Sequence, residues 1–512
     1  ARLEGRAVTR PLFCFCAAFA LGCIASQYFL APALWLPAAG IVLVLGALGL
    51  LLRGPMRRRV LLCALGMAFA FGWSAVYAHF IAAPNEALVG QTDEVELELC
   101  TYAVETNYGA KATVRILGRG LRGRAVYYGG FDLLALEPGE RVRDTVLFNS
   151  ATDPSGDGSH IRNFTSKGVY LLLYSRGEPS YETGDAGALR YAPQRIAKKL
   201  GETIETVYGE REGGFLRALL LGDKRYLDVE DSSNLSEAGI YHITAVSGLH
   251  CMFLVELLDR LLRASHRRTR CAVTIPLLFL YAVTVGASPS ILRACVMLSM
   301  TQLAPLFRRE KDPPTALGLA LLLILLKNPY AIASISLQLS FSAVAGLVWL
   351  TPKLTGAIHT GSRLLRFVLT SFATTLGALA FSTPLGAYYF GTFSVVSLLS
   401  NLLCLWMVSL VFGAGLLGLL LSMTVPAVGD IQSIEDFIVS NNLLPLGALF
   451  FVLFCTTRRG WGWDGFLAEA NAGKGVRFPA CARLWLKYGI PVLILVIFVL
   501  GYAPKIAAWP GL

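Results

Sequence analysis

Four residues that can carry chemistry lie within nine positions of the stretch Glu237–Glu256, which is apolar enough to enter a bilayer. They are His242, Ser247, Gly248 and His250. Lipid offers such groups no hydrogen-bond partner, so polar side chains at membrane depth face other helices or a water-filled path. Gly239 and Gly248 would let backbones approach closely, or would let the helix break and expose its carbonyls. The stretch alone leaves two interpretations of about equal weight: histidines satisfied by neighbouring helices, or a functional polar site.

Ser247 and His250, three residues apart, are also residue types that can serve as a nucleophile and its general base. No acidic residue that could orient the histidine follows until Glu256. The serine does not sit in a G-x-S-x-G elbow either, because Val246 precedes it and Gly248 follows it. An intramembrane hydrolase is therefore the third of three functional hypotheses.

Further polar groups interrupt apolar runs in the second half of the chain. They are Arg293 within Ser288–Ala294, Gln338 with Ser340 and Ser342, Ser382–Pro384, and Ser400–Asn401. An arginine costs roughly 2.5–3.5 kcal/mol at the centre of a spanning helix and less near its end. Singly, such residues are typical of snorkelling side chains and of clamps between helices. Together they favour one hydrated route. We expect it to be lined by His242, Ser247, Gly248, His250, Arg293, Gln338 and Asn401.

The composition indicates what kind of chain must position these residues. Of 512 residues, 55% are hydrophobic and 15% are charged, whereas a soluble domain averages about 25% charged residues. Apolar runs of helix-spanning length recur, and the alternating segments of an outer-membrane barrel do not. The sequence predicts a polytopic α-helical membrane protein with a soluble part.

Three apolar runs precede the one long polar region. They are Pro11–Leu30, Ala33–Leu52 and Val60–Ile81. Arginine clusters mark cytoplasmic loops, so we expect a cytoplasmic N-terminus and a polar region outside the cytoplasm. The same rule places Arg57, Arg267 and Arg309 inside and Lys111 outside.

Further apolar runs follow the central stretch. They are Cys271–Gly286, Ile291–Phe307, Thr315–Leu326, Ala331–Leu350, Arg366–Tyr389, Ser394–Met423 and Tyr488–Ala507. Arg458 and Arg459 should lie in the cytoplasm, but simple counting of spans places them outside. The parity is restored if either Ser394–Met423 or Val425–Asn442 enters and leaves by the same side, and the sequence leaves both open.

The net charge of +11 does not mark a nucleic-acid surface, because it is unevenly distributed. Asn85–Arg190 carries 11 Lys and Arg against 15 Asp and Glu, whereas the rest of the chain carries 34 against 19. The excess of positive charge lies mostly in short loops between apolar runs, as the positive-inside rule requires. The basic isoelectric point is a signal of topology.

The polar region alternates in the manner of short β-strands. Strand-like pieces separated by turn signals are Glu94–Leu99, Ala112–Leu117, Ala125–Tyr128, Val142–Phe148 and Val169–Tyr174. Five or six short strands in about a hundred residues are typical of a small β-barrel, of which the OB-fold is the commonest.

Cations lie beside aromatic rings in one part of this barrel. The residues are Arg119, Arg122, Arg124, Tyr127 and Tyr128. Stacking rings and positive charge are what a protein needs to bind single-stranded nucleic acid. A solvated face of a strand–turn–strand unit is the more frequent explanation of such a pattern, and the acidity of the domain favours it.

Neither cysteine nor histidine predicts a metal site. Only Cys100 of the 11 cysteines lies in the polar region, so no disulfide is expected there. Cys14 and Cys16 lie in an apolar run without histidines at zinc-ligand spacing, which is typical of packing residues. We expect no catalytic residue, no metal and no cofactor.

The segment Pro193–Tyr208 has the pattern of an amphipathic helix, with Ile196, Leu200 and Ile204 on one face. It is too polar to span a membrane, and it either lies at the membrane interface or packs on the barrel. The chain begins with Ala1 and stops after an apolar run. We therefore expect it to be a piece of a longer protein.

Several motifs resemble the competence domain of ComEC-type DNA-uptake channels. In order, they are Leu219–Arg225, Ala238–His250, Ser288–Ala294, Asn328–Tyr330, Gln338–Gly346 and Pro384–Phe390 with Leu399–Leu403. The polar segment, with Leu136–Gly139 and Phe164–Val169, resembles the OB-like extracytoplasmic domain of that family. The resemblance covers nearly the whole chain, and the competence-domain motifs are the specific ones.

The resemblance implies a channel that carries one strand of transforming DNA across the bacterial cytoplasmic membrane. It implies a DNA-receptor protein outside and a DNA-translocating ATPase inside as partners, beside membrane lipid. Many members continue into a metallo-β-lactamase-like nuclease domain with an HxHxDH zinc motif. Here no two of the six histidines lie two residues apart, so we expect any nuclease to lie outside this chain.

The sequence therefore predicts four parts. They are N-terminal membrane helices (1–82), an OB-like barrel (85–190), an amphipathic interfacial region (193–222) and a competence-type channel (236–508). The predicted function is import of single-stranded DNA during natural competence. The alternative is a transporter of small solutes or lipid precursors whose barrel binds a partner protein.

Overall fold

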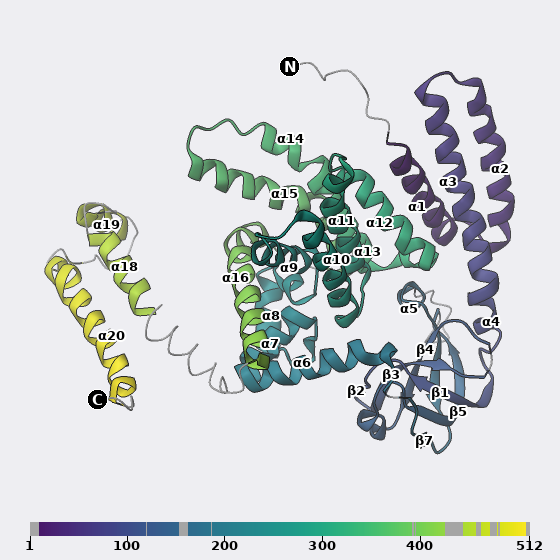
Figure 1. The fold of residues 1–512 in the computed structure, drawn as a ribbon, viewed down its shortest axis with the longest axis horizontal. Helices are drawn as coiled ribbons and strands as arrows, with labels where there is room; N and C mark the ends of the chain where they lie inside the picture. The colour runs from purple at the N-terminus through teal and green to yellow at the C-terminus, as the bar shows by residue number, and fades with distance from the viewer. Residues whose placement is uncertain are drawn as a thin grey trace. The chain divides into compact units, whose positions relative to one another are not determined.

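The computed structural model describes residues 10–118, 120–152, 162–185, 187–391, 394, 396–424, 444–456, 462–471, 479 and 482–507 (Figure 1). Arg119, the segment Val425–Asn442 and the pair Arg458–Arg459 lie outside the described residues. The chain divides into two units. The larger unit comprises Ala1–Glu202 and Gly214–Leu416, and the smaller one comprises Thr203–Gly213 and Leu417–Leu512.

Three apolar helices open the larger unit: α1 (Pro11–Tyr28), α2 (Trp35–Ala47) and α3 (Pro55–Tyr77). The third continues through a π-helical turn, Ala78–Ala82, into α4 (Ala83–Glu86). Small residues let α1 and α3 pack closely, since a Cβ on Gly66 would lie 2.5 Å from the Phe15 carbonyl oxygen. These helices confirm the first and third predicted runs, and the short 3₁₀ segments Pro32–Leu34 and Leu48–Leu51 extend α2 across the second.

Seven strands follow α4 in the part of this region that the structure describes. They are β1 (Thr92–Leu99), β2 (Val104–Thr106), β3 (Gly109–Ile116), β4 (Arg124–Gly129), β5 (Arg141–Ser150), β6 (Val169–Ser175) and β7 (Ser180–Glu182). The order β1-β3-β4-β6-β5 closes through the pairing of β1 with β5, which leaves a five-stranded barrel. β4 and β6 are its parallel pair. This confirms the predicted all-β domain, and its closed Greek-key arrangement agrees with an OB-like barrel.

Alternation along the strands builds the barrel core. In β1, Val95, Leu97 and Leu99 are buried, whereas the glutamates between them face outward. The hairpin from β2 to β3 requires Gly109, which has φ +152° and lies so close to β4 that a Cβ would meet the Gly129 carbonyl oxygen.

Two helices lead from the barrel into the second half of the chain, α6 (Ala192–Tyr208) and α7 (Glu210–Leu221). The amphipathic helix predicted over Pro193–Tyr208 is thus confirmed as a helix. Its first half contacts the barrel, because the Lys198 ammonium lies 4.7 Å from the centre of the Tyr102 ring.

The remaining described helices of the larger unit follow in chain order and differ in length. They are α8 (Val229–Glu237), α9 (Gly248–Leu261), α10 (Arg267–Thr284), α11 (Pro289–Leu303), α12 (Pro313–Lys327), α13 (Ile335–Trp349), α14 (Thr351–Gly356), α15 (Arg363–Phe390) and α16 (Ser397–Thr424). α16 continues into the smaller unit. That unit also holds α18 (Leu444–Thr456), α19 (Gly462–Ala470) and α20 (Ile490–Ala507).

Seven helical segments in the described part of the chain are long and apolar enough to cross a membrane. They are Pro11–Tyr28, Pro32–Leu51, Pro55–Glu86, Pro289–Phe307, Ile335–Gly356, Leu365–Phe390 and Ser397–Ser422. Pro313–Lys327, Pro445–Thr456 and Trp485–Phe498 are shorter apolar helices. The chain is therefore a multi-pass membrane protein with a β-barrel domain.

The central stretch does not form one spanning helix. α8 ends at Glu237, a 3₁₀ turn covers Tyr241–Thr244, and α9 begins at Gly248. Gly239, with φ +70°, adopts a left-handed conformation that ends α8. Both outcomes expected from the glycines are found, because the helix breaks here and Gly239 also packs closely against the start of α16.

One end of the barrel is fixed to the apolar helices. The Tyr170 hydroxyl of β6 donates a 3.0 Å hydrogen bond to the Tyr77 hydroxyl of α3. The Asn328 amide, after α12, donates to the carbonyls of Thr165 and Ser166 at 3.0 and 3.2 Å. Because these bonds are buried or half-buried, they fix the barrel against the apolar helices.

Candidate functional site

The turn between α8 and α9 packs tightly against the start of α16. A Cβ on Gly239 would lie 2.5 Å from the Ser397 Cβ and 2.8 Å from the Ser394 Cβ. The Ser394 hydroxyl donates a 3.0 Å hydrogen bond to the Glu237 carbonyl, which is one of the orphan acceptors at the end of α8. Glycine at position 239 is thus required both by its left-handed backbone and by this close contact.

Ser247 and His250 form the N-terminal cap of α9. The Ser247 backbone N–H donates to His250 Nδ1 at 3.0 Å, and the Leu249 N–H donates to Ser247 Oγ at 3.3 Å. This is a capping box, in which the two side chains satisfy the free N–H groups of the first turn. His250 Nδ1 is 3.3 Å from Ser247 Oγ, but it already accepts from the backbone. The pair is therefore explained as a cap, and its geometry gives no support to a nucleophile and base.

Arg293 is 7% exposed and lies in the second turn of α11. Its Nε donates a 2.9 Å hydrogen bond to Ser340 Oγ of α13, and Ser340 Oγ lies 2.9 Å from Ser290 Oγ. The Nη1 group lies 3.8 Å from Met297 Sδ. Among the described residues, no carboxylate forms an ion pair with this guanidinium. A buried cation without a counter-ion is costly, which marks Arg293 as a functional candidate.

Gly248 and Arg293 come together although they lie on different helices. A Cβ on Gly248 would lie 2.9 Å from Arg293 Nη2. Gly248 is the first residue of α9, where the helix dipole places a partial positive charge. The guanidinium and the helix N-terminus therefore raise the electrostatic potential of the same place, and such a place attracts anions. Four predicted residues, Ser247, Gly248, His250 and Arg293, thus form one cluster.

Gln338 is held by three groups. Its amide nitrogen donates to the Tyr28 hydroxyl at 3.2 Å and to the Ile332 carbonyl at 3.0 Å, and its oxygen accepts from the Tyr389 hydroxyl at 2.5 Å. These bonds join α1, α13 and α15. The contacts are those of a clamp between helices, which was one of the two interpretations of this residue.

Asn401 and His242 do not belong to the cluster; the first is buried and the second is exposed. Asn401 is 4% exposed, and its amide donates to the Ser397 carbonyl at 2.7 Å within α16. His242 lies in the 3₁₀ turn before α9 and has an exposed side chain. The structure therefore does not bring all seven predicted lining residues to one wall.

A group of charged residues that the sequence did not single out as a site lies just before α8. Asp223 accepts from Arg225 at 2.7 and 2.8 Å and from Arg217 at 3.2 Å. The Arg217 guanidinium, 5% exposed, lies 3.6 Å from the centre of the Tyr226 ring. Burial would raise the pKa of Asp223, but the hydrogen bonds and charge of Arg225, with the charge of Arg217, hold this pKa below its usual value. The motif Leu219–Arg225 carried the family resemblance, and it was the one signal for this group.

Tyr127 requires a correction to the predicted DNA-binding set. Its ring is 1% exposed inside the barrel, and its hydroxyl donates a 2.7 Å hydrogen bond to Asp144. Burial, followed by this hydrogen bond, raises the pKa of Tyr127 well above its usual value. A base cannot stack on a ring enclosed in this way. The prediction failed because strand alternation sends Tyr127 inward and Tyr128 outward.

Tyr128 stacks on a partner that the sequence analysis missed. Its ring is 4.9 Å from the ring of Tyr174, with an interplanar angle of 8°. Strand register places Lys111, Tyr128 and Tyr174 in one row across β3, β4 and β6. Lys111 is exposed, as are Arg122 and Arg124 beside the start of β4. Only pairing between strands distant in sequence creates this row.

The described residues include no group of three or more His, Cys, Asp or Glu side chains that could hold a metal ion. The cluster around Arg293 is instead made of a cation, hydroxyls, an imidazole and a helix N-terminus. The fold and this cluster define a polytopic helical membrane protein that carries a closed β-barrel and a buried, cationic polar site.

Comparison with known proteins shows which proteins the chain is similar to. Residues 219–457 match the family model described as competence protein, a range that begins at the motif containing Asp223 and includes the Arg293 cluster. The chain is 31% identical over 193 residues to ComE operon protein 3 of Bacillus subtilis, a match that covers 37% of this chain and 24% of that protein. Residues 219–457 are thus similar to the competence protein family.

Two other curated relatives are more distant. Recombination protein 2 of Haemophilus influenzae is 26% identical over 252 residues, covering 46% of this chain and 31% of that protein. The uncharacterized protein YcaI of Escherichia coli is 25% identical over 356 residues, covering 67% of this chain and 46% of that protein. The chain thus spans between about a quarter and a half of the length of these relatives. No solved structure matches it significantly.

Proposed function

We propose that this chain forms the membrane passage through which a competent bacterium imports single-stranded DNA. The competence-protein region and the multi-pass fold support this function. The relatives that match are longer proteins, so the proposal concerns the passage and leaves a nuclease to a separate domain or protein.

The observation that carries the proposal is the pairing of Arg293 with the N-terminus of α9. A polyanion that crosses an apolar region needs cationic and hydrogen-bonding groups, but few of them, because tight binding would stop it from leaving. One buried arginine, supported by Ser340 and facing Gly248, meets that requirement. In this proposal the phosphate groups of the strand pass the Arg293 guanidinium one after another.

The barrel contributes a second contact in this proposal. Tyr128 and Tyr174 supply a stacked aromatic pair, and Lys111 lies beside them in the same row. Both rings are half-buried. Aromatic rings that keep one face accessible beside neighbouring cations bind single strands, at roughly 1–3 kcal/mol per stacked base. Replacing both tyrosines by alanine should therefore weaken binding of a single-stranded oligonucleotide, and the remaining affinity should decrease with salt.

Crosslinking tests the passage directly. The exposed position of His242 is replaced by a photoreactive phenylalanine derivative in the full chain, reconstituted in lipid nanodiscs. We expect ultraviolet light to couple it to a single-stranded oligonucleotide more strongly than to a duplex. Coupling should decrease in the presence of the Arg293→Ala change, but not with Arg260→Ala, because Arg260 is exposed and pairs with Glu256. No coupling to either nucleic acid would favour the small-solute or lipid-precursor transporter.

The proposed orientation in the bacterial cytoplasmic membrane follows from the basic loops. It places the N-terminus in the cytoplasm and the barrel outside the cell membrane. In that arrangement a DNA receptor would meet the barrel and a DNA-translocating ATPase would act on the opposite side. Cysteines at positions 111 and 267, placed singly in a cysteine-free chain, report on the two sides. A membrane-impermeant reagent should label position 111 in intact cells, and labelling of position 267 would reverse the orientation.

A further inference from the structure

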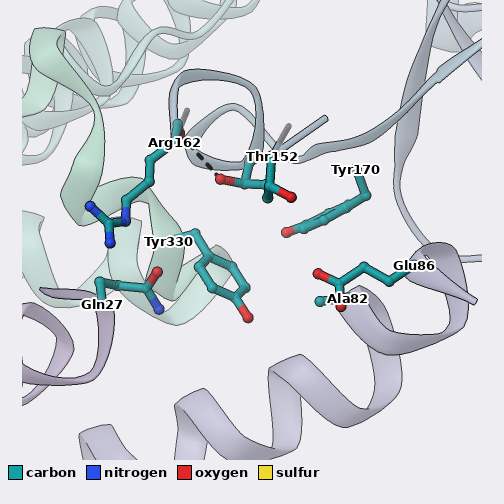
Figure 2. Close-up of a pocket in the computed structure, with 8 residues that line it drawn as sticks. Gln27, Ala82, Glu86, Thr152, Arg162, Tyr170 and Tyr330 are labelled. Atoms are coloured by element: carbon teal, nitrogen blue, oxygen red, sulfur yellow. Dashed lines mark hydrogen bonds between the residues drawn. The ribbon is translucent and has the colours of Figure 1, made fainter. Parts of the chain in front are cut away.

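A cavity lies where the barrel meets the apolar helices, apart from the Arg293 cluster. Its volume is about 100 Å³. Figure 2 shows the side chains that line it, which come from both parts of the chain. They are Gln27, Ala82 and Glu86 from the membrane helices, Tyr330 from the turn after α12, and Thr152, Arg162, Thr165 and Tyr170 from the barrel.

Three polar groups that line this cavity have no hydrogen-bonded or ion-paired side-chain partner among the described residues. The Gln27 amide nitrogen is buried without a hydrogen bond. The Arg162 guanidinium lies 4.6 Å from the centre of the Tyr28 ring and pairs with no carboxylate. Glu86 is exposed and has no basic partner among the described residues, and Arg162 is half-buried. A buried donor is normally satisfied, so the Gln27 amide beside two unpaired, opposite charges indicates that a ligand completes the group.

The two opposite charges lie at different ends of the cavity. In Figure 2, Arg162 and Gln27 lie on one side, Glu86 and Tyr170 on the other, and the Tyr330 ring between them. Tyr330 also packs edge-on against Tyr77, with ring centroids 5.7 Å apart, which fixes the dividing wall. Arg162 and Glu86 are therefore held apart rather than paired with each other.

This charge pattern restricts the chemistry of the ligand. A nucleic-acid phosphate would be attracted by Arg162 but repelled by Glu86. A metal ion would find one carboxylate, which is too few anionic ligands. A molecule with an anionic and a cationic end satisfies both charges and leaves the anion beside the donor amide of Gln27.

The position of the cavity indicates where such a molecule comes from. Gln27 lies in the last turn of α1, and Glu86 ends the apolar segment Pro55–Glu86, so both mark the same edge of the membrane region. Next to them, Phe29 is 80% exposed and presents an apolar surface at that edge. Acyl chains can lie against such a surface while the headgroup enters the polar cavity.

We propose that this cavity binds the headgroup of an aminophospholipid, with the phosphate at Arg162 and Gln27 and the ammonium at Glu86. A bound headgroup would join the barrel to the membrane helices. The site goes beyond the proposed function, because it neither contacts nor requires DNA.

Native mass spectrometry of the full purified chain tests the site. The chain is delipidated in detergent and titrated with phosphatidylethanolamine, phosphatidylglycerol or soluble glycerophosphoethanolamine. We expect phosphatidylethanolamine to bind most tightly. Arg162→Gln should weaken it about tenfold, since a charge-assisted hydrogen bond is lost. Glu86→Gln should remove the preference over phosphatidylglycerol, an effect specific to charge that a general loss of packing would not produce.

Matched controls are Arg176→Gln and Glu105→Gln, which remove exposed charges of the barrel that do not line the cavity. Both should bind like the wild type. Arg162→Lys should retain part of the affinity, and Gln27→Leu gives a second variant that leaves both charges in place. Thermal unfolding of each variant shows whether it is folded.

Two outcomes would overturn the site. Equal binding of phosphatidylethanolamine and phosphatidylglycerol by the wild type would mean that Glu86 does not bind an ammonium group. Binding of glycerophosphoethanolamine as tight as that of the intact lipid would mean that the ligand is a soluble zwitterion and not a membrane lipid.

Discussion

On the outer face of β1 and β5, each glutamate of the alternating run lies near an arginine. Glu94 pairs with Arg143 at 2.7 Å and Glu96 with Arg141 at 2.8 Å, and their side chains are about half exposed. Around Arg293 the opposite holds, because the guanidinium is buried and is satisfied by a hydroxyl instead of a carboxylate.

The difference shows where charge is used for solubility and where it is retained at a cost. Exposed ion pairs contribute about 0–1 kcal/mol each, since water already solvates both partners. They neutralise Glu94 and Glu96 on this face of the acidic barrel. A buried, unpaired arginine is costly to the fold. Such a residue persists when it acts on something, and in our proposal that is the phosphate backbone.

The largest expected effect is that of Arg293→Ala. It removes the cation from the proposed passage, so the transformation frequency of a competent bacterium that depends on this chain should decrease at least about tenfold, the value of one charge-assisted hydrogen bond. Arg293→Lys should retain part of the activity, because it keeps the charge but loses the planar fork.

Arg141→Ala is the control for this comparison. It removes an arginine from the exposed ion pairs between β1 and β5, which we call the exposed ladder, and it should change uptake less than about twofold. Immunoblots of membranes establish equal protein levels. Normal uptake in Arg293→Ala would remove this arginine from the path and leave the cluster a structural role.

Gly248→Ala should have the next largest effect. The new methyl group would lie 2.9 Å from Arg293 Nη2, so the guanidinium must move away from the N-terminus of α9. The side chain is flexible, so the protein should fold, while uptake decreases by less than in Arg293→Ala. Gly72→Ala is the matched control, because a Cβ there meets no atom within 4 Å. An unchanged uptake in Gly248→Ala would show that this spacing is unimportant.

Tyr127→Phe should destabilise the barrel without changing its surface. The change leaves the buried Asp144 carboxylate without its 2.7 Å hydrogen bond, at a cost of about 1–3 kcal/mol. Pulse proteolysis of the full chain in urea measures this loss. Tyr128→Phe should have little effect on stability, since stacking on Tyr174 does not use the hydroxyl. A larger loss in Tyr128→Phe would contradict the assignment of the two rings.

The same tyrosine gives a pH dependence whose sign is fixed. The folded state raises the pKa of Tyr127, so its contribution to stability is complete below the unfolded value, about 10. It is lost as the pH rises through the higher folded value. With a protease active at alkaline pH, the wild type should lose stability above about pH 10 more steeply than Tyr127→Phe. Parallel curves would show that Tyr127 does not titrate with unfolding.

The smallest effect is expected from the exposed ladder. A double-mutant cycle with Glu96→Gln and Arg141→Gln should give a coupling energy of about 0.2–1 kcal/mol, smaller still at high salt. The same proteolysis experiment reports it. A coupling energy that is large and insensitive to salt would mean that the exposed ion pairs behave like buried charges. The contrast between these pairs and the Arg293 cluster would then fail.

Much of this arrangement could be read from local patterns. Hydrophobic runs and basic loops predicted the spanning helices, and period-two alternation predicted the strands of the barrel, because both depend on residues close in sequence. The similarity to the competence protein family was also accessible, because motifs such as Leu219–Arg225 lie within the matched range 219–457. Gly239 indicated a possible break in the central stretch.

The tertiary structure decided what each polar residue touches. Whether Gln338 lines a route or clamps helices depends on Tyr28 and Tyr389, which lie 310 and 51 residues away. Tyr127 and Tyr128 have the same side chain, and only the closure of the barrel sends one into the core. Likewise, Gly248 meets Arg293 because α9 packs against α11. Local sequence determines which groups are available, but long-range packing determines their partners, and the partners determine the energy of a buried polar group.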